Sequence, residues 1–375
     1  MSKDAKNVPT LRFKGYSDAW EKRCLSDVLK VNSGRDYKHL SAGTVPVYGT
    51  GGYMLSVNKA LSNQDAIGIG RKGTIDRPYL LNAPFWTVDT LFYLTMKAAA
   101  EITFVFPLLQ RIHWKKLDES TGVPSLSKRV IETLSVYVPD KKEQQTIGNL
   151  FFFLDQLIAA TQDKIGALEQ VKETLSKNLF DQSWRFKEYS TPWKENKLKD
   201  IVSAYSGGTP SANIRTYYGG HIPFIRSAEI HSSTTALTLT QEGLKNSSAK
   251  LVKTGDILYA LYGANSGDVD RSKINGAINQ AILAMRPSKE NDSNFILFQL
   301  MRMKNKIVST YLQGGQGNLS GRIILALNLD MPESTSEQRT IGRSLQLLCE
   351  LISVNQSKYS QLESLKKSLL QNLFV

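Results

Sequence analysis

The residues best suited to chemistry lie in short glycine-rich segments that also carry cationic, hydroxyl or amide side chains. The first half contains Tyr48-Gly49-Thr50-Gly51-Gly52 and Ile69-Gly70-Arg71-Lys72-Gly73-Thr74, and the second half contains the segment 261–267 with Asn265 and Ser266. Glycine lets the backbone approach a phosphate, Arg or Lys can bind a phosphate or a guanine edge, and Asn can pair with adenine. These segments predict contacts with nucleic acid; tight turns with solvated charges are the alternative.

Residue patterns typical of catalysis are not found. The four histidines are isolated from the cysteines, and none belongs to an HExxH motif. The segment 68–73 has GxGxxG spacing, but 74–78 does not continue as a helix, which argues against a dinucleotide site. There is no Walker motif, no nuclease-like carboxylate cluster and no Asn/Asp-Pro-Pro-aromatic motif of the amino-methyltransferase type. The sequence therefore predicts a non-catalytic chain without a metal.

The composition indicates a globular protein with a polyanionic partner. The chain has 375 residues, 41% of them hydrophobic, which is enough for two or three domains. Its net charge of +13 and pI near 9.5 favour nucleic acid as that partner. Cys24 and Cys349 lie far apart in sequence, as expected of structural thiols in a reducing compartment. Without a signal-like N-terminus or an apolar run of about 20 residues, we expect a cytoplasmic protein.

The chain repeats itself. The segment 143–180 opens Glu-Gln-Gln-Thr-Ile-Gly, and it returns 194 positions later as Glu-Gln-Arg-Thr-Ile-Gly from Glu337. The start of each half also recurs, 173 positions apart, with Arg12, Tyr16 and Trp20 among the repeated residues. Because the two offsets differ by 21, the second half carries about that much additional chain between its matching ends. The recurrence predicts two equivalent units, with Trp20 and its counterpart Trp193 in their cores.

Two long helices are predicted over 143–180 and 337–375. Asp140 with Glu143, and Ser334 with Glu337, form capping-box-like starts. A heptad seam follows in both helices, with the polar Thr161 matched by Asn355 and Lys172 by Lys366, a pattern that can fix register. The seam positions are Leu154, Ile158, Thr161, Ile165, Leu168, Leu175, Leu348, Ile352, Asn355, Tyr359, Leu362 and Leu369.

The pattern favours pairing of the two helices as an antiparallel coiled coil, and separate packing of each helix on its own domain is the alternative. About 37 helical residues would span about 55 Å. The expected fold class is α+β, with two pseudo-repeated domains joined and separated by the helix pair. The domains are 1–142 and 181–336, and the helical spacers are 143–180 and 337–375. Strands are expected around 45–48, 87–94, 222–225 and 256–260, and a helix over 293–311.

Three parts of the sequence resemble one known family. They are the opening 11–20, the segment from Glu337-Gln338 to Leu373-Phe374, and Gly207-Gly208-Thr209-Pro210 with Tyr218-Gly219-Gly220-His221-Ile222-Pro223. With the repeat, they resemble a specificity (S) subunit of a type I restriction-modification system. The resemblance implies two target-recognition domains that each read half of a bipartite double-stranded DNA target, with the helices setting the unread gap.

The resemblance also implies partners. Two methyltransferase (M) subunits, which use S-adenosylmethionine, and motor-nuclease (R) subunits, which use ATP and Mg²⁺, would bind this chain, while the chain itself holds no cofactor. Phe151, Phe152, Lys164, Leu345 and Lys358, beside the seam, are candidates for docking. The rival hypotheses are a stand-alone two-headed DNA-binding protein without enzyme partners and an unrecognised DNA-modifying enzyme.

Two further loops, 120–129 and 313–322, match between the halves and combine glycine, hydroxyl and amide groups with Arg129 or Arg322, which suits a clamp on the DNA backbone. Structural turns are the alternative. The predicted DNA-binding residues are Tyr48, Arg71, Lys72, Thr74, Lys128, Arg129, Arg226, Ser227, Asn265, Ser266, Arg271, Asn318 and Arg322.

Overall fold

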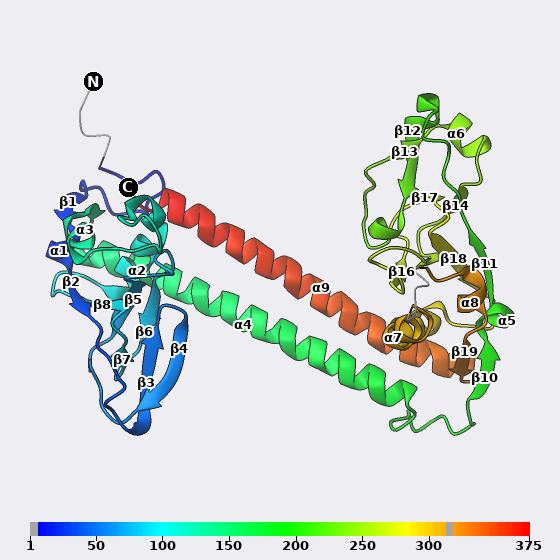
Figure 1. Cartoon of the computed structure of the whole chain (residues 1–375), viewed down its shortest axis with the longest axis horizontal. Helices are drawn as coiled ribbons and strands as arrows, with labels where there is room; N and C mark the ends of the chain where they lie inside the picture. The colour runs from blue at the N-terminus through cyan, green and yellow to red at the C-terminus, as the bar shows by residue number, and fades with distance from the viewer. Residues whose placement is uncertain (1–6, 313–317) are drawn as a thin grey trace. The chain divides into compact units, whose positions relative to one another are not determined.

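A computed structural model describes residues 7–312 and 318–375 (Figure 1). The chain forms two compact units. Unit 1 comprises Met1–Lys164 with Asn355–Val375, and unit 2 comprises Ile165–Val354. Each unit therefore contains the chain that precedes one long helix and parts of both long helices, α4 (Lys141–Phe180) and α9 (Thr335–Asn372).

Unit 1 contains three antiparallel or mixed sheets. The strand orders are β2-β8-β5-β6, β4-β3-β7 and β1-β9, and only the pairing of β3 with β7 is parallel. The strands are β1 (Glu21–Cys24), β2 (Leu29–Ser33), β3 (Ala42–Gly49), β4 (Gly52–Val57), β5 (Ala66–Gly70), β6 (Tyr79–Leu81), β7 (Trp86–Thr87), β8 (Leu91–Met96) and β9 (Ser135–Val138). The shorter helices are α1 (Leu25–Val28), α2 (Ile102–Arg111), the 3-10 helix η2 (Trp114–Leu117) and α3 (Lys128–Thr133).

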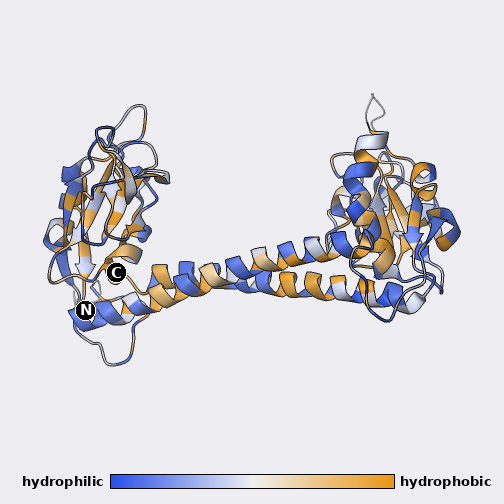
Figure 2. Cartoon of the chain, turned by 90° about the horizontal axis from the view of Figure 1, so that it is seen from below, coloured by the Kyte–Doolittle hydropathy of each residue, from blue (hydrophilic) through white to orange (hydrophobic). Residues whose placement is uncertain are grey.

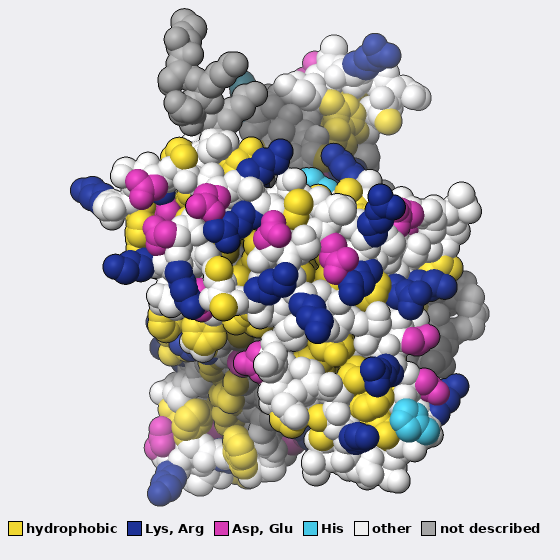
Figure 3. Space-filling model, turned by 90° about the vertical axis from the view of Figure 1, so that its left-hand side faces the viewer, with side chains coloured by type: hydrophobic (Ala, Val, Ile, Leu, Met, Phe, Trp, Pro, Cys, Tyr) yellow, Lys and Arg dark blue, Asp and Glu magenta, His cyan; other side chains and the backbone are white. Residues whose placement is uncertain are grey.

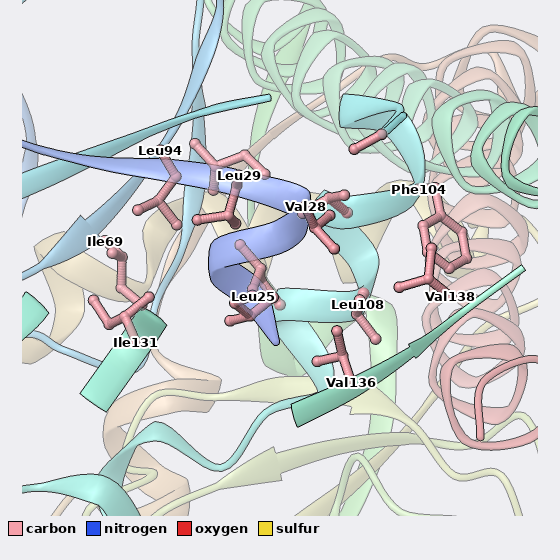
Figure 4. Packing of buried hydrophobic residues seen from close by; sticks show 14 of the residues in the cluster. Leu25, Val28, Leu29, Ile69, Leu94, Phe104, Leu108, Ile131, Val136 and Val138 are labelled. Carbon is pink, nitrogen blue, oxygen red and sulfur yellow. The ribbon is translucent and has the colours of Figure 1, made fainter. Parts of the chain in front are cut away.

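The main core of unit 1 lies between the β2-β8-β5-β6 sheet and the helices, where aliphatic side chains from α1, α2, α3 and β9 converge (Figure 4). Trp20, Phe104, Phe151 and Phe374 form an aromatic cluster, with ring centroids 5.3 to 6.2 Å apart along its contacts. Phe374 follows α9, so the last residues of the chain complete the core of the unit that contains its first described residues.

Unit 2 has the same plan. Its sheets are β11-β18-β15-β16, β13-β12-β17-β14 and β10-β19. The strands are β10 (Lys194–Lys197), β11 (Val202–Ser206), β12 (Tyr218–Ile225), β13 (Thr238–Leu239), β14 (Lys250–Val252), β15 (Ile257–Ala260), β16 (Val269–Arg271), β17 (Gly276–Ile278), β18 (Ile282–Pro287) and β19 (Asn328–Met331). The helices are α5 (Leu198–Ile201), η3 (Arg215–Tyr217), η4 (Ser227–Glu229), α6 (Gln241–Lys245), α7 (Ser293–Tyr311) and α8 (Gly321–Leu325).

Phe180, at the end of α4, packs in unit 2 as Phe374 does in unit 1. Its ring lies 5.1 Å from that of Phe295, and Trp193 lies 5.4 Å from the same ring. Hydrophobic residues recur along the strands of each unit (Figure 2). Trp20 is 2% exposed and Trp193 is half-buried, so the predicted core role of both tryptophans is confirmed.

The additional residues of the second half lie mainly between β12 and β15. In unit 1, Gly49 ends β3 and Ala66 begins β5, whereas the matching interval in unit 2, from Ile225 to Ile257, is longer and includes α6 and β14. Leu239 and Ala249 of this insertion are buried in a small core with Phe224 of β12 and Ala277 of β17. The sheets and long helices that recur in both units, which we call the frame, are therefore shared. The added chain extends one sheet of unit 2.

The predicted long helices and their mutual packing are confirmed. The helix α4 has 40 residues and α9 has 38. The helices pack in opposite directions in unit 1, where Lys366 Nζ lies 2.7 Å from Asp155 of α4. Thr161 and Asn355 are buried at 4% and 8% exposure, and the other predicted seam positions are buried or half-buried. The α+β class with two repeated units follows from these elements.

The seam register can be read from one pair in each unit. Asp155 contacts Lys366 in unit 1, and Lys172 lies close enough to Cys349 in unit 2 to act on its pKa. Burial raises the pKa of the Cys349 thiol, and the Lys172 charge opposes that effect. On α4, the midpoint in sequence between Asp155 and Lys172 falls between Asp163 and Lys164. On α9, the midpoint between their partners, Lys366 and Cys349, falls between Ser357 and Lys358. We infer that these two points lie opposite each other along the seam.

The repeated Arg and Glu residues fasten each recognition segment to its long helix. Arg12 Nε and Nη2 donate to the two carboxylate oxygens of Glu143 at 2.7 Å each, and Arg185 donates to Glu337 in the same way at 2.8 and 2.9 Å. Both carboxylates are at most 2% exposed. The hydrogen bond to Glu143 raises the pKa of Arg12. The repeated residues therefore form one ion pair in each unit, in which the carboxylate is buried and the arginine is partly exposed.

This pairing corrects the predicted helix starts. Asp140 does cap α4, since its Oδ1 accepts from the backbone N–H groups of Lys142 and Glu143, and Ser334 accepts from Glu337. The reciprocal half of the capping box is wrong, because the carboxylates of Glu143 and Glu337 bind arginines from distant segments instead of the cap backbone.

The Gln and Gly residues of the repeated Glu-Gln-x-Thr-Ile-Gly motif allow a second helix to pack closely against the start of each long helix. Gln144 accepts from the backbone N–H of Glu101 and donates to the Pro139 carbonyl. A Cβ on Gly148 would lie 2.4 Å from Thr103 Oγ1, near the start of α2, and a Cβ on Gly342 would lie 2.6 Å from Asp292 Oδ1, near the start of α7. The motif therefore permits close approach of α2 or α7 to the long helix.

One predicted strand is wrong in part. The segment 87–94 is divided between β7 and β8, with a turn in which the Leu91 N–H donates to the Val88 carbonyl. The turn hydrogen-bonds to two other segments. The Val88 N–H donates to the Tyr48 carbonyl, and the Thr90 carbonyl accepts from the N–H groups of Arg71 and Lys72. The helix predicted over 293–311 is confirmed as α7 with the same bounds.

Candidate nucleic-acid interface

The β3–β4 hairpin presents the first glycine-rich segment. Gly49 pairs with Gly52 across the Thr50-Gly51 turn, and Gly52 has φ +106°, which favours glycine there. Tyr48 is half-buried between Tyr53 and Tyr79, with ring centroids 6.4 and 6.2 Å away. Tyr79 Oη donates to the Gly49 carbonyl at 2.6 Å, and burial raises the pKa of Tyr79. The aromatic packing fixes the hairpin, and its tip is solvent-exposed.

Arg71 and Lys72 are held by their backbone, and their side chains are exposed. Their N–H groups donate to the Thr90 carbonyl, and the Arg71 carbonyl accepts from Leu126. The Arg71 guanidinium lies 5.9 Å from the centre of the Phe92 ring. A Cβ on Gly70 would lie 2.0 Å from the Thr74 carbonyl oxygen, so Thr74 folds back against Gly70 and is half-buried.

The loop before α3 completes a basic cavity in unit 1. Asp118 Oδ1 accepts from the N–H and hydroxyl of Ser120 and from the N–H of Ser125, and these hydrogen bonds lower the pKa of Asp118. Ser127 caps α3. The cavity, of about 320 Å³, brings together three predicted residues from two segments, Arg71 and Lys72 from one and Lys128 from the other. It is also lined by the acidic Glu119 and by five uncharged residues. Arg129 is exposed and does not line it.

In unit 2 the corresponding loop, 261–267, is shaped by its own hydrogen bonds. Ser266 is 7% exposed and its hydroxyl donates to the Gly263 carbonyl at 2.8 Å, so this side chain supports the loop. Asn265 is half-buried and its amide makes no hydrogen bond to any residue that the structure describes. Asn318 forms a β-bridge with Tyr262, which places the start of the α8 region beside this loop. Residues 313–317 of the matched loop lie outside the described residues.

Arg226 and Ser227 are adjacent at the start of η4, and Arg271 lies on β16. Arg226 makes two hydrogen bonds to Glu229, at 3.0 and 3.1 Å, which lower the pKa of that carboxyl. Arg271 donates to the Gly255 carbonyl and to Asn294, and burial lowers its pKa. Ser227 begins η4 and is half-buried. Both arginines have intramolecular partners, and their DNA contacts stay predictions.

Sequence reasoning missed Tyr53. It is 63% exposed on β4, edge-on to Tyr48, beside the hairpin tip. The signal was the near-symmetric Tyr-Gly-Thr-Gly-Gly-Tyr sequence, in which both tyrosines flank the turn. Over the face drawn in Figure 3, basic and acidic side chains are interspersed, so the loop geometry defines the candidate interface better than the net charge does.

The two units therefore define a protein with two repeated α+β units, whose candidate nucleic-acid loops differ from each other. The family model described as type I restriction modification DNA specificity domain matches residues 17–170 and 190–364. These matches cover most of the chain, so the chain belongs to this family. It is the DNA-recognition component of such a system and not a catalytic one.

Individual relatives agree with the family match. The type I restriction enzyme MjaVIII specificity subunit of Methanocaldococcus jannaschii is 24% identical over 334 residues, covering 83% of this chain and 76% of the relative. The putative MjaX specificity subunit of the same organism is 24% identical over 267 residues, covering 66% of this chain and 60% of the relative. The crystal structure of a type I restriction-modification S subunit from M. genitalium shares the fold, with a TM-score of 0.78 at 16% identity, covering 98% of this chain and 99% of that one.

Two further findings limit the kinds of site. Within residues 7–312 and 318–375, no helix has the length and apolarity that a membrane crossing requires. No group of three or more His, Cys, Asp or Glu residues in the same ranges is placed to hold a metal ion. The candidate loops are fixed by backbone hydrogen bonds and carry cationic and amide side chains. Such side chains can bind phosphates and base edges.

Proposed function

We propose that this chain recognises a bipartite DNA target, one half with each unit, and directs methyltransferase and restriction subunits to it. The observation that carries the proposal is the contrast between frame and loops. The Arg–Glu pair and the Gln and Gly contacts recur in both units, while the candidate readers differ. Unit 1 offers Arg71 and Lys72 where unit 2 offers Asn265, and these side chains favour different bases.

The helix pair sets the gap between the half-sites in this proposal. Each of α4 and α9 is one continuous helix of 40 or 38 residues, and each contributes to both units. At 1.5 Å per residue, such helices are about 57 to 60 Å long. A length determined by residue count supports a fixed gap.

Matching apolar positions on the helices support two copies of one partner. Phe153 and Leu157 of unit 1 are 65% and 42% exposed, and their counterparts 194 positions later, Leu347 and Leu351 of unit 2, are 42% and 49% exposed. These positions flank the heptad seam on one side of each helix. Exposed apolar positions that recur in this way indicate two equivalent docking surfaces, which we assign to two methyltransferase subunits.

Cofactors belong to the partners in this proposal. S-adenosylmethionine would be held by the methyltransferase subunits, and ATP and Mg²⁺ by the motor-nuclease subunits. This chain would contribute the DNA address and the docking surfaces.

Replacing Phe153 with aspartate is expected to remove one of two methyltransferase copies, because a charge would be buried at an apolar interface. Leu347→Asp should remove the other copy, and the double variant both. The measurement is the mass of the complex formed with the system's methyltransferase subunit, by light scattering. Gln162→Asp, exposed on the opposite flank of the seam, is the matched control and should keep both copies. Two copies bound to the double variant would contradict the docking assignment.

Exchanging Lys194–Glu333 for the corresponding segment of another family member is expected to change one half-site only. The exchange leaves Arg185, Trp193 and Glu337 in place, so the frame of unit 2 is retained. Methylation mapping in cells that carry the complete system would reveal both half-sites. A change in the half-site read by unit 1 would contradict independent reading.

A further inference from the structure

Unit 2 contains a basic cavity that lies apart from the glycine-rich loop. The cavity has a volume of about 460 Å³ and is lined by Lys197, Lys199, Arg322, Leu325 and Ala326. Lys197 lies at the junction of β10 and α5, Lys199 lies on α5, and Arg322 on α8. The Leu198 N–H donates to the Leu327 carbonyl at 2.9 Å, which holds α5 against the end of α8. The fold therefore gathers three cations from two segments far apart in sequence.

No carboxylate among residues 7–312 and 318–375 forms an ion pair with these cations. All three are exposed. Other basic residues of unit 2 are paired, such as Arg185 with Glu337 and Arg286 with Asp256. Like charges around one hollow repel each other unless an anion lies between them. The cavity therefore has the charge of an anion site.

The comparison of the units separates this cavity from the shared frame. At the positions of Lys197 and Lys199, unit 1 has Cys24 and Ser26. At the position of Leu325 it has the acidic Glu132, and only the arginine is retained, as Arg129. A partner that docks alike on both units needs the same residues in both. The ligand of this cavity is therefore one that contacts unit 2 and unit 1 differently, as DNA does when each unit binds a different sequence.

The place of α8 relates the cavity to the candidate interface. Asn318, just before α8, bridges to Tyr262 in the glycine-rich loop, and the cavity is lined by Arg322 near the start of α8 and by Leu325 and Ala326 at its end. Because α8 has five residues, its ends are about 7 Å apart. Along a DNA strand this is about two steps of 3.4 Å. A duplex read by the loop can thus reach the cavity within two nucleotides.

We propose that Lys197, Lys199 and Arg322 bind the DNA backbone beside the half-site read by unit 2. The Arg322 guanidinium can donate hydrogen bonds to two oxygens of one phosphate. Lys197 and Lys199 add positive charge without requiring a particular base. The cavity is thus an anchor that unit 1 lacks. This assignment rests on the proposal that unit 2 reads a half-site.

The test is the salt dependence of DNA binding by the full chain carrying Lys197→Gln and Lys199→Gln. The probe is a fluorescent duplex containing the mapped target, and the readout is the slope of log affinity against log salt concentration. Losing one or two phosphate contacts should reduce that slope by about 0.9 to 1.8. The affinity at low salt should fall by about 5- to 30-fold, on target and non-target duplexes alike, with both half-sites unchanged.

A matched variant separates the cavity from net charge. Lys177→Gln with Lys187→Gln removes two exposed lysines from the same unit and should leave the slope within about 0.3 of the unmodified chain. Conversely, Cys24→Lys with Ser26→Lys, at the matching positions of unit 1, should increase the slope. Equal slopes for the cavity variant and its matched control would overturn the anchor. Failure of the unmodified chain to prefer target over non-target DNA would instead contradict the reading of half-sites.

Discussion

Replacing Glu143 with alanine is expected to lower the free energy of unfolding of unit 1 by about 3 kcal/mol. The change leaves the Arg12 guanidinium, which is 11% exposed, without the two hydrogen bonds of 2.7 Å that now neutralise it. Arg12 would keep only its hydrogen bond to the Asp18 carbonyl. Since the ion pair fastens residues 11–20 to α4, its loss should loosen the opening segment. Urea denaturation followed by tryptophan fluorescence would measure the change.

The repeat supplies a second test of the same pair, and the surface supplies a control. Glu337→Ala should destabilise unit 2 to a similar extent, because Glu337 also accepts from Trp193 Nε1 at 3.1 Å. Glu21→Ala removes an exposed ion pair with Arg23 and should cost less than about 1 kcal/mol. If Glu143→Ala destabilised the protein no more than Glu21→Ala, the pair could not be what fastens each unit to its helix.

The sequence repeat predicted the frame because the frame residues contact each other. Arg12 and Glu143 recur at their own offsets, and the structure joins them in both units. Helical periodicity predicted α7 and the long helices for a similar reason, since burial of one face leaves a regular pattern. The seam pattern alone left open whether the helices pair, and the contact between Lys366 and Asp155 answers that.

Other features depended on tertiary partners that no local pattern contains. The turn at 88–90 interrupts a β-prone run because Tyr48, Arg71 and Lys72 use its backbone groups. Arg271 was predicted to contact DNA from its type and position, but its hydrogen bonds to Gly255 and Asn294 arise only in the fold. Lys197 and Lys199 were missed because they meet Arg322 only through the packing of α5 on α8.

Inserting one heptad into both long helices is expected to lengthen the gap between the half-sites. The insertions follow Asp163 in α4 and Ser357 in α9, the two points that we infer to lie opposite each other along the seam. Seven residues preserve the heptad pattern and extend each helix by about 10 Å. This corresponds to about three base pairs of DNA at 3.4 Å each. Since neither insertion touches a candidate reader, both half-sites should stay the same.

A heptad in α4 alone is the matched control. It would shift the seam on one side of the insertion, so that Asp155 and Lys366 could not pair while Lys172 stayed near Cys349. This variant should therefore unfold more easily and methylate poorly. The comparison separates the length of the helix pair from the mere presence of added residues.

Methylation mapping of cells that carry the doubly extended chain with its partner subunits measures directly whether the helix pair sets the gap. We expect methylation at a target whose two half-sites are those of the unmodified chain, separated by a gap about three base pairs longer. Methylation at the original target with its gap unchanged would show that the helices do not set the spacing.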